Sequence, residues 1–124
     1  GNILWRDEVV MVDFDDSRMG VAIQDFWMLL NGSKQEQIIQ LDTILESYYE
    51  YQDFDLRELS LIEPLRAMRM VHYLAWGLKR WNDPAFPRAF IWFQEQDFWF
   101  KQLALFKGQV EQLNEPPLQL SPMY

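Results

Sequence analysis

The spacing of apolar residues changes once along the chain, and that change decides which fold classes are open to it. Two short apolar runs with high β-propensity cover residues 3–6 and 9–14, and Asp7 and Glu8 between them favour a tight turn. From Val21 onward, apolar residues recur at the spacing of amphipathic helices. The pattern predicts one β-hairpin followed by four to five helices. This is an α+β fold, mostly α, in a single domain over residues 1–124.

Capping and breaking residues place the expected helices. After a loop over residues 15–20, a helix is expected over 21–30, with Asn31 and Gly32 as its stop. Ser33 and Glu36 have the spacing of a capping box, which predicts a helix from Ser33 to about residue 51.

The same capping pattern recurs at Asp55 and Glu58, and Pro64 falls early in the next apolar run. We therefore expect a short helix to about residue 62 and a long one over about 63–81. Residues 82–87 carry two prolines and predict a break. A last helix is expected over 95–113, followed by an extended tail over 116–124.

Composition narrows the classes of partner and compartment. A formal net charge of −8 makes the chain a poor match for phosphate backbones, so we expect no nucleic-acid partner and no docking to an anionic membrane. The absence of cysteine excludes disulfides and thiolate catalysis, and it fits a reducing compartment. No apolar run is long enough to span a membrane, and the first residues do not have the pattern of a signal peptide.

Asn2 and Asp13 are the candidate metal ligands. A hairpin with its turn near residues 7–8 brings the start of the first run and the end of the second to the same end of the ladder. Amide and carboxylate oxygens suit Mg²⁺, and Asp13, Asp15 and Asp16 cluster where their repulsion needs a cation or solvent to offset it. The alternative interpretation is that Asn2 is a frayed terminal residue and Asp13 a turn former.

Ordered sequence blocks along the whole chain carry a family resemblance. They are residues 2–5, 12–16, Gly20, 24–25, 62–69, 73–76, 83–87 and 115–124. Together they resemble the aminoglycoside phosphotransferase and choline kinase superfamily, and within it bacterial cytoplasmic Ser/Thr protein kinases. The resemblance implies the C-terminal, helical part of a kinase-like C-lobe.

The resemblance also assigns roles to three residues. Asn2 matches the Asn that closes the catalytic loop and binds magnesium, and Asp13 matches the second metal-binding Asp, which is also counted as catalytic. Asp25 matches a buried Asp that supports the catalytic-loop backbone. An ordinary Asp near a helix N-terminus, favoured by the helix dipole, explains Asp25 equally well.

Other parts of the family's site are missing from the sequence. The His-Gly-Asp of the catalytic loop would end four residues before Asn2, and the nucleotide-binding lobe would precede it. The resemblance implies that the intact protein transfers the γ-phosphoryl group of ATP, with magnesium, to Ser or Thr of a protein substrate. Small-molecule hydroxyl acceptors stay open. We expect the 124 residues alone to lack activity and to bind neither Mg²⁺ nor ATP tightly.

A different class of function stays open beside this one. The chain could be a stand-alone helical interaction module, the remnant of a truncated or split gene, with the kinase shape and without its chemistry. Exposed apolar surface on the hairpin and on residues 21–30 would then favour self-association, with hairpins paired in a homodimer.

The remaining candidates have structural interpretations. We interpret His72 as a structural side chain, and Arg66 and Arg69 as partners of Glu63 in helix-surface ion pairs, with a phosphate or peptide role as the less favoured option. The aromatic residues over 86–100 are expected to pack in a core, with a substrate groove, or a surface that covers the missing upstream half, as the alternative. The acidic residues over 36–63 form either a solvated face or a patch that attracts basic peptides.

Overall fold

The computed structural model describes residues 1–120 and begins with the expected hairpin. Strand β1 (Ile3–Trp5) pairs antiparallel with β2 (Val9–Met11), with Ile3 opposite Met11 and Trp5 opposite Val9. The second strand is shorter than the predicted 9–14. Asp13 has a left-handed backbone (φ +67°), which is incompatible with continuing the extended strand.

The segment over 21–30 differs from the single helix that the sequence predicts. It forms a four-residue helix, α1 (Ile23–Phe26), which tightens into the 3-10 turn η1 (Trp27–Leu29) before Leu30 becomes extended. Ile23, Trp27 and Leu30 are all buried in one apolar cluster, so the helical apolar stripe was correctly identified. A tertiary contact lies at its start: the Ile23 N–H donates to Glu58 Oε2 (2.9 Å), 35 positions away in the sequence.

The caps of the next two elements follow the sequence in part. Helix α2 (Lys34–Tyr48) begins with the predicted capping box: Ser33 Oγ accepts from the Glu36 N–H, and Glu36 Oε2 accepts from the Ser33 N–H. The 3-10 helix η2 (Leu56–Leu61) is capped by Asp55, whose Oδ1 accepts from the Arg57 N–H (2.9 Å). Glu58 does not complete a second capping box, because its carboxylate bonds the start of α1 instead.

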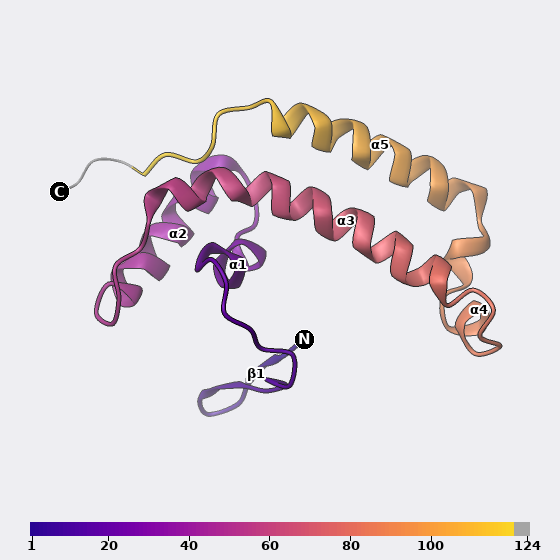
Figure 1. The fold of residues 1–124 in the computed structure, drawn as a ribbon, viewed down its shortest axis with the longest axis horizontal. Helices are drawn as coiled ribbons and strands as arrows, with labels where there is room; N and C mark the ends of the chain where they lie inside the picture. Colours follow the sequence, from indigo (N-terminus) through magenta and orange to yellow (C-terminus); the bar gives the residue numbers. More distant parts are fainter. Residues whose placement is uncertain (121–124) are drawn as a thin grey trace.

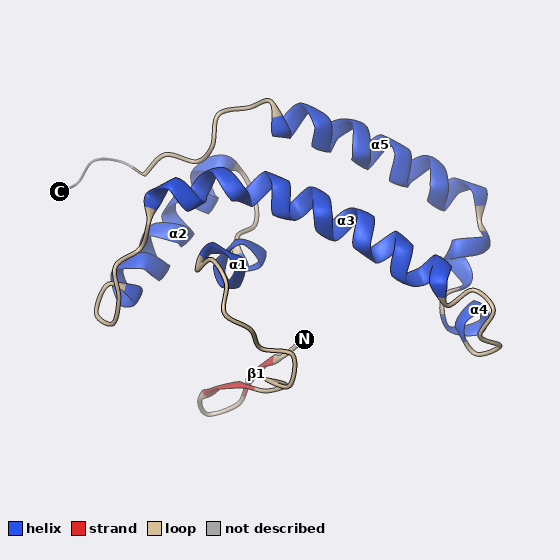
Figure 2. Ribbon diagram, in the orientation of Figure 1, coloured by secondary structure: helices blue, strands red, loops and turns tan. Residues whose placement is uncertain are grey.

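Two long antiparallel helices form the length of the molecule (Figure 1). Helix α3 (Ile62–Lys79) and helix α5 (Gln96–Leu113) lie side by side, near the predicted bounds. The chain between them includes the predicted break over 82–87 and then forms two short helical turns that the sequence did not predict, α4 (Phe86–Ala89) and η3 (Ile91–Gln94). These turns reverse the chain direction (Figure 2). The structure is therefore an α+β fold of mostly helical character, as predicted.

Apolar clusters lie at the two ends of α3. The first is formed between α1, α2 and the start of α3, and it contains Ile23, Trp27, Leu30, Leu41, Leu45, Phe54, Leu59 and Ile62. The second is aromatic: Phe86 and Phe93 are buried, and the rings of Trp76, Phe90, Phe98 and Trp99 pack on one or both of them. Core packing, as expected for residues 86–100, thus accounts for much of this run, although Phe100 is exposed.

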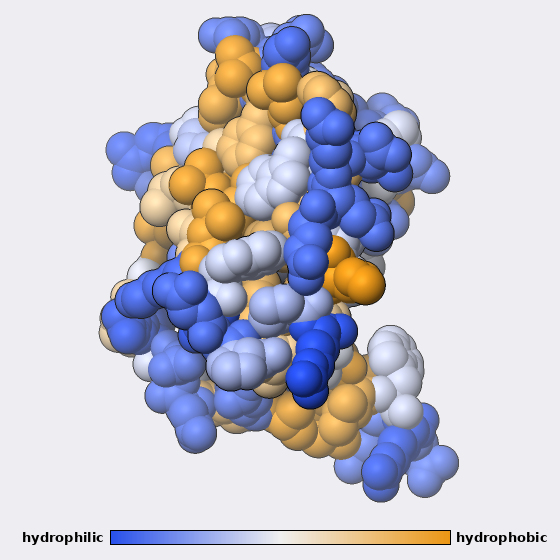
Figure 3. Space-filling model, turned by 90° about the vertical axis from the view of Figure 1, so that its right-hand side faces the viewer, coloured by the Kyte–Doolittle hydropathy of each residue, from blue (hydrophilic) through white to orange (hydrophobic). Residues whose placement is uncertain are grey.

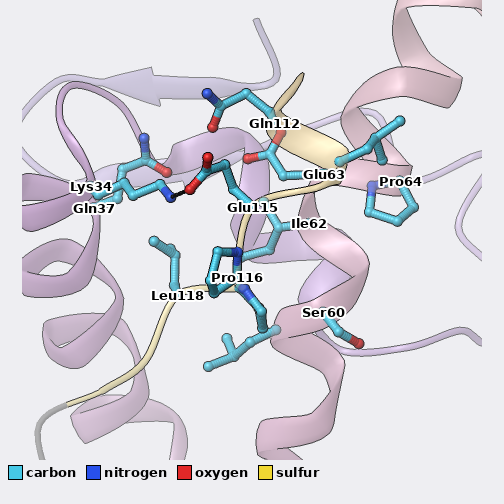
Figure 4. Close-up of a pocket in the computed structure, with 13 residues that line it drawn as sticks. Lys34, Gln37, Ser60, Ile62, Glu63, Pro64, Gln112, Glu115, Pro116 and Leu118 are labelled. Atoms are coloured by element: carbon cyan, nitrogen blue, oxygen red, sulfur yellow. Dashed lines mark ion pairs between the residues drawn. The ribbon is translucent and has the colours of Figure 1, made fainter. Parts of the chain in front are cut away.

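The chain after α5 crosses the first cluster. Leu118 and Leu120 pack against that cluster, and Lys34 and Glu115 form an ion pair (Nζ–Oε2 3.5 Å) beside a cavity of about 220 Å³ (Figure 4). This segment corresponds to the predicted tail over 116–124, whose last four residues lie outside the described part of the chain.

The hairpin is the least covered part of the fold. Every residue from 1 to 21 is exposed, and the hairpin lies apart from the helices in Figure 1. Apolar side chains also reach the surface at the α4 end of the molecule (Figure 3). Among residues 1–120, no helix has the length and apolar character needed to span a membrane.

Candidate functional site

The hairpin brings the two predicted metal ligands to the same end of its ladder. The Val12 N–H donates to the carbonyl oxygen of Asn2 (3.0 Å), so the backbone of Asp13 directly follows the residue paired with Asn2. The turn near residues 7–8 that this juxtaposition requires is present, since Trp5 and Val9 close the ladder at its other end. Both side chains are exposed, in keeping with a site open to solvent or to another part of a larger protein.

Asp13 has an unusual backbone for a residue with a side chain. Its φ of +67° lies in the left-handed region, and it is the sole non-glycine residue with positive φ in the described part of the chain. Asp tolerates this region better than most residues, because its short polar side chain can bond locally. Such strained positions occur disproportionately at ligand-binding and catalytic sites. The geometry thus marks Asp13 as a position worth testing for function, independently of its sequence context.

The chemistry of the pair suits an open magnesium site better than a closed metal cage. Within residues 1–120, no group of three or more His, Cys, Asp or Glu side chains lies close enough to hold a metal. Mg²⁺ does not require such a cage, because it usually binds one or two carboxylates and completes its shell with water and substrate phosphates. Asn2 and Asp13 offer one amide oxygen and one carboxylate for that arrangement.

Asp25 lies in the first turn of α1, and its side chain is exposed. Its carboxylate accepts no hydrogen bond from residues 1–120, and the side chain is not buried as the resemblance implies. Its position near a helix N-terminus agrees with the helix-dipole interpretation, although a four-residue helix provides little dipole. Its role in supporting a catalytic loop stays a prediction.

The predicted ion pair on α3 is present and extends into a polar network. Arg66 Nε contacts Glu63 Oε2 (3.1 Å), and the buried Gln109 of α5 donates to the same oxygen (2.8 Å). Arg69 is exposed and has no recorded ion pair within residues 1–120. His72 is exposed beside a mainly apolar groove between α3 and α5, so it is not packed in the core.

The perturbed pKa values belong to helix caps. Hydrogen bonds from the Ser33 backbone and hydroxyl lower the pKa of Glu36. Hydrogen bonds from the Arg57 side chain and backbone lower the pKa of Asp55, and Asp55 in turn raises the pKa of Arg57. Glu36, Asp55 and Glu58 thus have structural partners, and this accounts for part of the acidic middle of the sequence.

Comparison with known proteins identifies the family. The model of the phosphotransferase enzyme family matches residues 1–62, which is half of the chain. The chain belongs to the phosphotransferase enzyme family. The matched half of this family member contains the hairpin, α1, α2 and all three predicted site residues.

Curated relatives of this phosphotransferase family member match over its full length. It is 60% identical over 124 residues to "Stress response kinase A" of Escherichia coli (strain K12), and 60% identical to "Serine/threonine protein kinase RdoA" of Salmonella typhimurium. A "Stress response kinase A" of Shigella flexneri is 59% identical. The chain spans 38% of the length of these relatives and corresponds to their C-terminal part.

Sequence reasoning missed two features with a bearing on function. One is Glu58, which joins the start of α1 to η2; its capping-box spacing pointed to a local partner instead. The other is a cleft in which Trp27, Arg66 and Arg69 come together. The spacing of Arg66 and Arg69, three residues apart on one helix, was the available signal for that cleft.

Proposed function

We propose that this chain is the metal-holding, C-terminal part of a protein kinase that transfers the γ-phosphoryl group of ATP to Ser or Thr of protein substrates. The observation that carries the proposal is the pairing of Asn2 with Val12 beside the strained Asp13, in a hairpin that lies within the family match. The names of the relatives, which include a Ser/Thr protein kinase, support the choice of acceptor. A cytoplasmic location is part of the same proposal.

In this proposal the chain's own residues hold the magnesium ion that neutralises charge on the phosphates. Magnesium, when bound, would supply electrostatic stabilisation of the transferring phosphoryl group. Asn2 would contribute its amide oxygen and Asp13 its carboxylate. The left-handed backbone of Asp13 turns the chain out of the strand directly beside Asn2. The residue that orients the acceptor hydroxyl would come from the part of the relatives that precedes this match.

The test is ATP-dependent phosphoryl transfer by the protein at the full length of its relatives. We expect Asp13→Asn, which keeps the shape and removes the charge, to reduce the rate by at least about a hundredfold, as the loss of a key electrostatic contact does. Asp7→Asn is the matched control, since Asp7 is an exposed Asp in the turn at the other end of the ladder. It should change the rate by less than about threefold, because an exposed charge outside the site contributes little.

Two outcomes would contradict the proposal. Full activity of a folded Asp13→Asn variant would remove Asp13 from the site. Equal losses from Asp13→Asn and Asp7→Asn would indicate a general effect of acidic charge. Denaturant unfolding of both variants shows whether a loss arises from the fold, and we expect the free energy of unfolding to change little because both side chains are exposed. The 124-residue chain alone should show no transfer in the same assay.

The exposed hairpin favours the alternative of a self-associating interaction module. A two-stranded hairpin is marginally stable alone, and Trp5 is 79% exposed on it. In a homodimer, the hairpins would pair across a two-fold axis and cover this surface. Light scattering over a concentration series tests this for the 15.0 kDa chain.

A charged substitution makes that experiment specific to the hairpin. Val10→Lys on β2 should shift the chain to monomer, because a charge on an edge strand opposes strand pairing. Met19→Lys adds the same charge at an exposed residue outside the strands and should leave the dimer intact. A monomer at every concentration would exclude the homodimer.

A further inference from the structure

An open cleft of about 460 Å³ lies where η1, α3 and α5 meet, and it gathers hydrogen-bond donors. Arg66, Arg69 and Tyr73 line it from α3, Trp27 from η1 and Gln102 from α5. Apolar side chains of Met28, Leu30, Met70 and Leu105 form the rest of its wall. The cleft is built from elements other than the hairpin, so the proposed metal ligands do not account for it.

Arg66 is held in place before any ligand binds. Its Nε donates to Glu63 Oε2, and its guanidinium lies over the Trp27 ring, 5.4 Å from the ring centroid. Glu63 is fixed in turn by Gln109, a buried side chain that is 7% exposed. Within residues 1–120, Arg66 donates a hydrogen bond through Nε alone, so both terminal nitrogens are available as donors.

Trp27, which lines the cleft, also carries an unpaired donor. The side chain is 4% exposed, and its Nε1 is the one buried side-chain nitrogen or oxygen without a hydrogen-bond partner among the described residues. Buried polar groups are nearly always satisfied, and an exception calls for an explanation. Tyr73 adds a hydroxyl that accepts from Trp92 Nε1 (3.4 Å) and retains its own hydrogen to donate.

The charge of the cleft selects an anion. Two arginines oppose one carboxylate, that of Glu63, which is already engaged by Arg66 and Gln109. The local excess of positive charge is notable in a chain whose formal net charge is −8. Two guanidinium groups one helical turn apart can present several donors to a tetrahedral anion, and the guanidinium fork suits phosphate oxygens.

We propose that this cleft binds a phosphate monoester, such as a phosphorylated side chain, with Arg66 and Arg69 on the phosphoryl oxygens. The apolar wall then contacts the body that carries the phosphate, which favours a phosphorylated side chain over the bare anion. The proposal goes beyond the transfer reaction and does not depend on it, because it requires neither ATP nor Asp13.

Titration of the 124-residue chain with O-phosphoserine, followed by NMR of the indole N–H signals, tests the site directly. The chain has six tryptophans, and Trp27→Phe assigns the Trp27 signal. We expect that signal to shift saturably at low salt and the affinity to fall as salt is added. Arg69→Gln should weaken binding by about tenfold, the loss of one charge-assisted hydrogen bond. It should not unfold the chain, because Arg69 is exposed.

Arg88→Gln is the matched control, since Arg88 is an exposed arginine on α4 outside the cleft. It should leave the affinity unchanged. Titrations with inorganic phosphate and with glutamate show which part of O-phosphoserine is recognised. Weaker binding of inorganic phosphate than of O-phosphoserine supports contacts between the apolar wall and the side chain that carries the phosphate. Equal binding of the two supports a site for the phosphoryl group alone. Glutamate binding as tightly as phosphoserine would overturn the assignment to phosphate. No saturable shift, or equal losses from Arg69→Gln and Arg88→Gln, would overturn the site.

Discussion

Replacement of Gly77 by alanine tests the aromatic cluster that joins α3 to the turn region. A Cβ atom at Gly77 would lie 2.4 Å from Cζ and 2.5 Å from Cε1 of Phe93, and 3.3 Å from Cζ of Phe86. Carbon atoms in van der Waals contact are about 3.5–4.0 Å apart, so the Phe93 ring would have to move by about 1 Å or more.

The Phe93 ring has little room for that movement. It is 2% exposed and packs against other rings at centroid distances of 4.9 Å (Phe98), 5.5 Å (Phe86) and 5.8 Å (Trp99). Overpacking of a filled core costs about 1–3 kcal/mol. Against this cost, replacing glycine by alanine in a helix interior adds about 1 kcal/mol of stability through helix propensity. Since the required displacement is large, we expect Gly77→Ala to lower the free energy of unfolding by about 1–2 kcal/mol.

Gly108 provides the opposite case in the same kind of element. It lies within α5, and a Cβ atom there would meet nothing within 4 Å. Gly108→Ala should therefore raise the free energy of unfolding by about 0.5–1 kcal/mol through helix propensity alone. Urea unfolding at equilibrium measures both variants. A Gly77→Ala variant as stable as Gly108→Ala would refute the close packing of α3 against Phe93.

Three further changes test other contacts of the helical part. Ser33→Ala removes the cap of α2 and should cost about 1 kcal/mol in urea unfolding, whereas a neutral result would mean that the capping box contributes nothing to the fold. Because the pKa of Glu36 is lowered in the folded chain, the stability that its carboxylate contributes is complete at neutral pH and is lost as pH falls below the ordinary value of 4.5. Glu36→Gln should therefore reduce the loss of folding stability at acid pH. An unchanged dependence of the free energy of unfolding on pH would count against the hydrogen bonds from Ser33 to Glu36. Gln109→Leu leaves Glu63 without a buried donor and should cost about 1–3 kcal/mol, whereas Gln112→Leu, at an exposed position of the same helix, should stay within about 0.5 kcal/mol; equal effects would count against the network.

Local signals predicted those parts of the fold that depend on neighbours in the sequence. Ser33 and Glu36 cap α2 because both partners lie within one turn, and the positive φ of Gly32 (+82°) suits its predicted place at a chain stop. The helix expected over 21–30 is shorter than predicted and tightens into a 3-10 turn, and its start bonds Glu58, a partner 35 residues away. Such distant partners override local propensity and leave no periodic trace.

The same distinction applies to the two candidate sites. Asn2 and Asp13 could be brought together from the sequence because a hairpin has a fixed pairing rule, and the observed register satisfies it. The cleft beside Arg69 could not, because Trp27 and Gln102 line it from two other elements that are distant in the sequence. The lone signal was the spacing of Arg66 and Arg69, which a surface ion pair explains equally well.

The distribution of stability along the chain links the fold to the proposed functions. The helical part has two buried clusters joined by α3, so we expect it to fold as a unit and to hold the cleft beside Arg66 and Arg69 in shape. The hairpin has a ladder of three residue pairs and no buried side chain among residues 1–21. Because such a hairpin is marginal by itself, Asn2 and Asp13 need further contacts to be held in one geometry. We therefore expect the proposed metal site to need contacts from outside the hairpin, whereas the proposed phosphate site should bind its ligand in the 124-residue chain alone.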